Sequence, residues 1–216
     1  MIYGVAVNDL PDHKTQIVEK HINSFGKVTR KVVWQCPFYT KWFNMLSRCY
    51  KKSELTRHPT YENKTVCEEW LKFSNFKKWM EQQDWENKEL DKDILFSGNS
   101  IYSPSTCVFV SKEINKFILE KTKIRDFPIG VSFHKKKSKF IASISLGRNG
   151  KIQHLGTFDN QYEAHLYWAE RKLSLVIELV KSEDERVANA LVDRYTSMYY
   201  NAKRRYEEFI NGEKLV

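Results

Sequence analysis

Residues 127–158, FPIGVSFHKKKSKFIASISLGRNGKIQHLGTF, decide the fold of the second half of the chain. Strand-like runs lie at 129–134, 139–146 and 151–158, because β-branched and aromatic residues recur in each of them. The sequence KKKS separates the first two runs and GRNG the last two, and the RNG turn is typical of a hairpin. The stretch therefore predicts a three-stranded antiparallel sheet.

A long helix is predicted directly after this sheet. Asp159 or Asn160 can cap a helix that begins at Gln161. The residues that then recur at helical spacing form one stripe: Tyr162, His165, Leu166, Ala169, Leu173, Val176, Ile177 and Val180. We expect this stripe to pack on one face of the sheet.

The charge of the predicted sheet has one sign. Lys and Arg number 36 in the chain and Asp and Glu 27, which gives a net charge of +9 and attracts polyanions. Residues 127–158 contain no Asp or Glu, yet they contain six cations: Lys135, Lys136, Lys137, Lys139, Arg148 and Lys151. This composition makes nucleic acid the first partner to test.

Side chains alternate along a strand, so the two faces of the sheet differ. If Phe140, Ala142, Ile144 and Leu146 face the helix, then Lys139, Ile141, Ser143 and Ser145 point to the opposite face. A twisted sheet of this size can enter the major groove, where Ser, His and Lys side chains meet base edges and lysines neutralise phosphates. The alternative is a solvated face whose lysines only keep the protein soluble.

The first half of the chain is predicted to mix helices and strands. Short strands are expected at 2–7 and 28–34, and helices at 38–50 and from Val66 to before Trp85, where aromatic residues recur at spacings of three and four. This spacing favours core packing of the tryptophans over a stacking platform for single strands. Residues 90–115, LDKDILFSGNSIYSPSTCVFVSKEIN, predict a ββα unit with a hairpin turn at Ser97–Asn99.

The predicted fold class is α+β, with an N-terminal ββα-containing domain at 1–120 and the sheet-and-helix domain at 121–181. The charged stretch KTKIRDFP at 121–128 closes with a proline, as a linker does. Residues 182–216 add a C-terminal helix with a stripe of tyrosines. That helix either closes the core or pairs with a second copy, which would give a homodimer that reads two half-sites.

The remaining composition excludes several classes of protein. The four cysteines form no CxxC pair, so we expect buried, reduced thiols, and the six histidines do not cluster with them as zinc ligands. The N-terminus lacks a secretory signal, and no run of 18 apolar residues occurs. We therefore expect a cytoplasmic protein without membrane contact.

The sheet region resembles an AP2-type DNA-binding domain, the three-strand-and-helix module of plant transcription factors and of many phage endonucleases. The matching residues are Gly130, Val131, Lys139, Phe140, Ala142, Ile144, the run Leu155–Phe158, Glu163 and Ala164. The positions that face bases and phosphates in this pattern are Ser132, His134, Ser143, Ser145, Arg148, Ile152 and His154. Together with Lys136, Lys139 and Lys151, the polar members of this set are the expected DNA-binding residues. Plant domains usually carry Arg, Glu or Trp at several of these positions, so this chain departs from the plant pattern in the side chains that it presents to bases.

The upstream half is similar to the HNH endonucleases found free-standing in phage genomes. The likeness is carried by Cys36, Pro37, Tyr39, Trp42, Met45, Leu46, Arg48, Cys49, Tyr50, Val66, Cys67, Trp70, Phe73, Phe76 and Trp79, and by residues 90–115. In that family a His deprotonates water, an Asp or His and a helical His or Asn hold one divalent cation, and a loop Asn orients the base. Carried over by position, Lys92 lies at the general-base site and Thr106 at the loop Asn site. Asp91 and Asn115 lie at the metal-ligand sites.

The residues that depart from the HNH pattern are those at its catalytic positions. A lysine is a poor base at neutral pH, and its charge repels a cation, while Thr106 cannot reproduce the hydrogen bond of an amide. Asp91 and Asp93 could still bind Mg²⁺, whose bound water would act as the nucleophile. Otherwise two aspartates that flank a lysine form a solvated turn.

Two main functions follow from these resemblances. The first is a sequence-specific double-stranded DNA-binding protein without a cofactor, a repressor in the bacterial host cell during phage infection, in which the catalytic set Asp91, Lys92, Asp93 and Thr106 is degenerate. The alternative is an active, Mg²⁺-dependent, site-specific HNH homing endonuclease. A third class is a protein-interaction module whose cationic sheet docks an acidic partner.

Overall fold

The computed structural model describes residues 1–22, 24–118, 126–146 and 151–212. The chain forms two compact units, 1–109 and 110–216, and each is described by itself. Helices and strands both occur throughout, as the predicted α+β class requires. The domain boundaries expected at 120/121 and 181/182 stay predictions.

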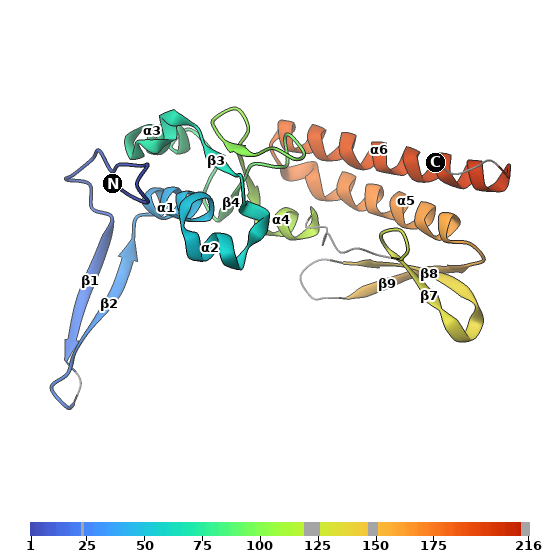
Figure 1. Cartoon of the computed structure of the whole chain (residues 1–216), viewed down its shortest axis with the longest axis horizontal. Coiled ribbons are helices and arrows are strands. Elements are labelled where there is room, and N and C mark those ends of the chain that lie inside the picture. Colours follow the sequence, from blue (N-terminus) through green and yellow to red (C-terminus); the bar gives the residue numbers. More distant parts are fainter. Residues whose placement is uncertain (23, 119–125, 147–150, 213–216) are drawn as a thin grey trace. The chain divides into compact units, whose positions relative to one another are not determined.

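The first unit begins with a long hairpin followed by short helices and strands (Figure 1). Strands β1 (Gln16–Ile22) and β2 (Val28–Gln35) pair antiparallel, whereas β3 (Thr65–Val66) and β5 (Ile101–Tyr102) pair parallel. Strand β4 (Lys88–Asp91) pairs with β6 (Val108–Ser111). The helical elements are α1 (Pro37–Tyr50), α2 (Lys52–Arg57), η1 (Pro59–Tyr61), η2 (Glu68–Leu71) and α3 (Phe73–Met80).

The core of the first unit is aromatic. Trp42 on α1 and Phe73 on α3 are fully buried, and the indole N–H of Trp42 donates a hydrogen bond to the Trp70 carbonyl at 2.6 Å. Helix α1 begins with Pro37. The N–H of the first helical residue has no partner within the helix, so a proline, which lacks this N–H, loses no hydrogen bond there. Trp42, Met45, Leu46 and Cys49 of α1 are buried, and so is Trp70, so the expectation of core packing for Trp42 and Trp70 is confirmed.

Three local predictions in the first unit are wrong. Residues 2–7 form isolated bridges instead of a strand. The helix expected from Val66 is split, because the extended Lys72 lets Val7 donate to the Leu71 carbonyl at 2.9 Å and accept from the Phe73 N–H at 3.1 Å. The Ser97–Asn99 turn does not close a hairpin, since β4 pairs with β6 and β5 with β3.

The second unit contains the predicted antiparallel sheet, in the order β7 (Val131–His134), β8 (Lys139–Ser145) and β9 (Ile152–Phe158). Helix α5 (Gln161–Leu179) begins where the sequence predicts, and the Asn160 side chain accepts the Glu163 N–H at 2.8 Å as its N-cap. Helix α4 (Lys112–Ile118), η3 (Lys135–Lys137), η5 (Val180–Ser182) and α6 (Glu185–Ile210) complete the unit.

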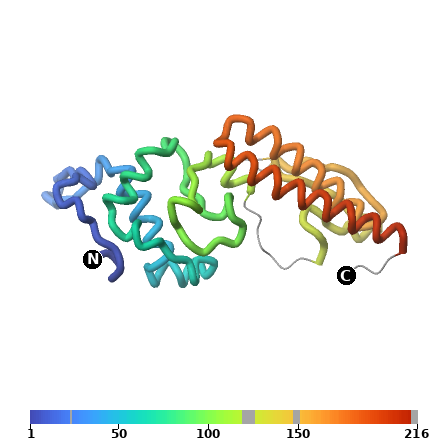
Figure 2. The backbone as a smooth tube through the Cα atoms, turned by 90° about the horizontal axis from the view of Figure 1, so that it is seen from above, coloured from blue at the N-terminus to red at the C-terminus, as the bar shows by residue number. Residues whose placement is uncertain are grey.

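The second unit is layered, with α5 between the sheet and α6 (Figure 1), and Figure 2 shows the two long helices side by side. Ala142 and Ile144 of β8 are buried together with Ala164, Trp168 and Ala169 of α5. Helix α6 packs against α5, and its buried residues are Val187, Leu191, Tyr195 and Ala202. Helix α6 thus closes the core of this unit, and a homodimer stays a prediction.

The loop before β7 is fitted to the face of α5. Gly130 has a left-handed backbone, with φ at +80°, and a Cβ placed on it would lie 2.0 Å from Cδ1 of Trp168. The ring of His165 stacks on Trp168 at 5.6 Å, and its Nδ1 lies 2.9 Å from the Ile129 carbonyl oxygen. Only glycine allows this close approach of backbone to indole.

Buried thiols are found where the sequence predicts them. All four cysteines are free, and Cys36, Cys49 and Cys107 are buried. Burial raises the pKa of the Cys49 thiol to about 11 and that of Cys107 to about 12. In the part of the chain that the structure describes, no helix is both long and apolar enough for a membrane span.

The start of α6 provides a pH-dependent prediction. The Asp184 side chain accepts the Arg186 N–H at 2.9 Å and the Arg186 guanidinium Nε–H at 3.0 Å, and these bonds to Arg186 lower the pKa of the carboxyl below 3.8. A carboxyl whose pKa is lower in the folded than in the unfolded protein stabilises the fold at pH values above its unfolded pKa. This stabilisation is lost as the pH falls through the folded pKa. Asp184→Ala should therefore cost about 1 kcal/mol at neutral pH. The cost, measured by hydrogen exchange at the start of α6, should shrink as pH falls below 3.8. A cost that does not change with pH would contradict this assignment.

Candidate nucleic-acid interface

Strand register assigns each side chain of the β7–β9 sheet to a face. The pairs Ser132↔Ile141 and His134↔Lys139 share the face opposite to the buried Ala142. The pairs Ser143↔His154 and Ser145↔Ile152 continue that face along β8 and β9. We call this surface the open face: Ser132, His134, Lys139, Ile141, Ser143, Ser145, Ile152, His154 and Thr157. It contains every expected DNA-binding residue on the three strands, so the predicted alternation is confirmed for Lys139–Ser145. Leu146, which was expected to face the helix, lies beyond β8 and is 38% exposed.

A β-bulge sets which side chains of β9 reach the open face. Ala142 is paired with Gly156 and Ser143 with His154, so Leu155 is the extra residue of β9. A bulge re-aims the side chains on either side of it. His154 and Thr157 are three residues apart, yet both are exposed, and Thr157 Oγ1 lies 3.5 Å from His154 Nε2. Thr157 is not among the expected DNA-binding residues, because strict alternation from His154 assigns it to the core side of the sheet.

No helix of the second unit, among its described residues, lies over the open face, since α5 covers the other side of the sheet (Figure 1). Ser132, Ser145, Ile152, His154 and Thr157 are exposed there, and the other members are half-buried. The face is therefore accessible within its own unit, polar on most positions, and free of acidic residues.

Lysines lie at the edges of the open face. Lys135, Lys136 and Lys137 form η3 between β7 and β8, and all three are exposed. The backbone N–H of Lys137 donates to Nδ1 of His134 at 3.4 Å, which holds the turn against the strand. Lys151 is exposed just before β9, and Arg148 lies outside the described residues. Exposed cations therefore flank the open face.

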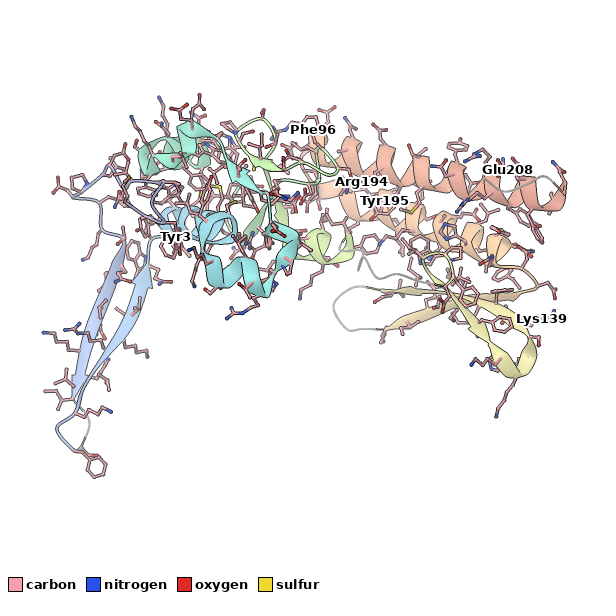
Figure 3. The ribbon with its side chains drawn as sticks, in the orientation of Figure 1. Tyr3, Phe96, Lys139, Arg194, Tyr195 and Glu208 are labelled. Atoms are coloured by element: carbon pink, nitrogen blue, oxygen red, sulfur yellow. The ribbon has the colours of Figure 1, made fainter. Side chains whose placement is uncertain are left out.

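Lys139 differs from the other lysines because its ammonium forms an ion pair with the Asp159 carboxylate. Figure 3 labels Lys139 on the sheet. Asp159 is the first acidic residue after the acid-free stretch, so the count over 127–158 did not include it. The charge of Lys139 is therefore partly compensated, and Lys136 and Lys151 are the stronger candidates for phosphate contacts.

Three of the predicted catalytic residues, Asp91, Lys92 and Asp93, lie in a tight turn at the end of β4. Asp91 Oδ1 accepts the backbone N–H groups of Asp93 at 2.7 Å and Ile94 at 2.8 Å. Burial raises the pKa of Asp91, although these two hydrogen bonds oppose the rise. Such bonds to the main chain are typical of an aspartate that shapes a turn.

Lys92 is buried, and its ammonium contacts Asp93 and Asn99. Its side chain is 4% exposed, and its ammonium lies 2.7 Å and 2.6 Å from the two oxygens of Asp93. It also donates to the Asn99 carbonyl at 3.1 Å, while the Asn99 amide donates to the Lys92 carbonyl at 2.9 Å. Asn99 thus braces the loop that begins at the turn, a role that its place in the SGN sequence did not reveal.

Thr106 and Asn115 lie in other elements. Thr106 Oγ1 donates to the Ile101 carbonyl at 2.7 Å and accepts the Ser103 N–H at 3.2 Å, so it braces the turn before β6. Asn115 lies on α4, which belongs to the second unit. The structure therefore brings Asp91, Lys92 and Asp93 together in one turn and places Thr106 in a second.

Mg²⁺ does not fit the Asp91–Asp93 turn as it is arranged. Among the described residues, no group of three or more His, Cys, Asp or Glu side chains could hold a metal ion. Both oxygens of Asp93 contact the Lys92 ammonium, so a dication bound there would meet a fixed positive charge.

Lys92 is predicted to be structural. Lys92→Met should remove charge-assisted hydrogen bonds worth about 2 kcal/mol from the stability of the first unit, measured by hydrogen exchange. The control is Lys88→Met, which breaks a 2.7 Å surface pair with Asp84 and should cost less than about 1 kcal/mol. A cost for Lys92→Met no larger than that for Lys88→Met would contradict the structural role.

Comparison with known proteins finds no relative. No family model matches the chain, no curated protein shows a significant match to it, and no solved structure shows a significant match to its fold.

Proposed function

We propose that this protein binds double-stranded DNA sequence-specifically through the open face of the β7–β9 sheet. The observation that carries the proposal is a sheet face that no described helix of its own unit covers, with no acidic residue among its members, exposed polar side chains and lysines at its edges. A two- or three-stranded β-surface can enter the major groove, which is about 12 Å wide.

The side chains divide into two roles. Ser132, Ser145 and His154 are suited to hydrogen bonds with base edges, because hydroxyl and imidazole groups can both donate and accept. Lys136 and Lys151 are suited to phosphates, which position a protein on the duplex without reading its sequence. The exposed Ile152 supplies an apolar contact of the kind that recognises a thymine methyl group.

We also propose that the first unit is an HNH-like framework whose catalytic centre is degenerate. The support is that Lys92 is buried against Asp93 and that Asp91 is bonded to the main chain. A protein that binds a site and does not cut it acts by occupancy, so the proposed biological role is that of a repressor. The phage origin and the cytoplasm of the bacterial host belong to the same proposal.

One selection tests this function. Random duplexes are incubated with the full chain and Mg²⁺ or Mn²⁺, and both the bound and the cleaved products are sequenced. The proposal predicts an enriched sequence, binding that weakens steeply with salt, and intact DNA. Discrete fragments at the enriched site would instead establish the endonuclease. Binding of an acidic protein but not of duplex at low salt would favour an interaction module.

A further inference from the structure

The β1–β2 hairpin has no core of its own. Every residue of both strands is exposed, and the hairpin extends away from the helices of the first unit (Figure 1). Apolar side chains are exposed along it, with Ile22 71% and Val28 55% exposed, and Phe25 near the tip 92% exposed. A lone two-stranded hairpin is only marginally stable in water, so a partner that covered these apolar side chains would stabilise it.

Register divides the hairpin into two unlike faces. The pairs Val18↔Val32, Lys20↔Arg30 and Ile22↔Val28 share one face, which we call the Lys20 face. The pairs Glu19↔Lys31 and His21↔Thr29 alternate with these three pairs along the strands. Their side chains share the opposite face, which we call the Lys31 face. The bulge between Ile17 and Val18 lies outside both sets of pairs.

The charges on the two faces are arranged differently. On the Lys31 face, Glu19 is directly opposite Lys31, and its carboxylate lies 3.6 Å from Nε2 of His21. On the Lys20 face, two cations are directly opposite one another and the other four side chains are apolar. Like charges at opposite positions destabilise a strand pair. The Lys20 face therefore favours an anionic partner over solvent.

We propose that the hairpin is a second DNA-contacting element, whose Lys20 face lies against a duplex. This inference rests on the proposed function. A two-stranded ribbon fits the major groove, where Lys20 and Arg30 would meet phosphates or guanine edges and the valine and isoleucine side chains thymine methyl groups. A second copy of the chain is a poorer occupant, because two Lys20 faces would bring four cations together.

The test uses matched variants on the two faces of the hairpin. Lys20→Gln removes one cation from the Lys20 face, and Lys31→Gln removes one from the Lys31 face. Lys20→Gln should weaken binding to the selected duplex several-fold and reduce the salt-dependence slope by about 0.9. It should also stabilise the free hairpin slightly, since it relieves the repulsion with Arg30. Lys31→Gln should leave affinity and slope unchanged. Fluorescence anisotropy gives both quantities.

The outcomes separate this inference from the proposed function. If the wild-type chain binds no duplex, the proposed function fails and the hairpin inference fails with it. If the wild type binds and open-face variants lose binding, but Lys20→Gln and Lys31→Gln behave alike, only the hairpin inference is overturned. A change in sedimentation mass with Lys20→Gln, without a change in duplex affinity, would assign the Lys20 face to a contact between copies and would also overturn it.

Discussion

The double variant Ser132→Glu/Ser145→Glu is expected to bind the selected duplex about 100-fold more weakly than the wild type, or worse. Both serines are exposed on the open face, one on β7 and the other at the end of β8. Each substitution removes a hydroxyl that can bond a base edge and brings a carboxylate toward phosphates. About 1–3 kcal/mol for each lost base contact gives this magnitude.

The control for this variant makes two Ser→Glu substitutions elsewhere in the second unit, so that the net charge changes by the same amount. Ser174 and Ser197 are exposed on α5 and α6, away from the open face. Ser174→Glu/Ser197→Glu should stay within about three-fold of wild-type affinity at physiological salt, because distant exposed charges are screened over about 8 Å. Equal losses in the two double variants would mean that net charge, and not the open face, governs binding.

Gly130→Ala is expected to cost the second unit about 2–4 kcal/mol. The new methyl group would lie 2.0 Å from the Trp168 indole on a backbone with φ at +80°, so either the loop or the ring must move. The loss is measured by hydrogen exchange in peptides from β7 and α5, and displacement of Trp168 by near-ultraviolet circular dichroism.

Gly98→Ala is the matched control for this substitution. Gly98 has a similar φ of +78°, but a Cβ there meets nothing within 4 Å. Its substitution should cost only the left-handed conformation, about 1 kcal/mol in the first unit. If the two substitutions cost the same, the contact between Gly130 and Trp168 does not contribute to stability.

The second unit was predictable because its sequence signals are local. Alternation along 139–146 assigned the faces of β8, and the polar pair Asp159–Asn160 marked the start of α5. The bulge at Leu155 was not predictable, since it depends on how β9 pairs with β8 and not on either strand alone. The Lys139–Asp159 pair was missed for a similar reason, because the start of β8 and the residue after β9 are distant in sequence and become neighbours only when the two strands pair.

The first unit was harder to read because long-range contacts override its periodicity. The bridge between Val7 and Lys72 interrupts a helical pattern that continues in sequence through 66–80. Strand β1 carries charged and apolar residues on both faces, so no alternation marks it as a strand. Three of the candidate catalytic residues, Asp91, Lys92 and Asp93, are consecutive in sequence and share one turn, but Thr106 lies in another, and the role of Asn99 depends on hydrogen bonds that only the folded loop shows.

Photo-crosslinking from the open face is the most direct test of duplex recognition by the β7–β9 sheet. A benzophenone side chain replaces Ser145 in one protein and Ser197 in another, two exposed serines of the same unit. The selected duplex should crosslink strongly from position 145 and only at background level from position 197. Crosslinking from position 197 alone, or equally from both positions, would contradict DNA recognition by the open face.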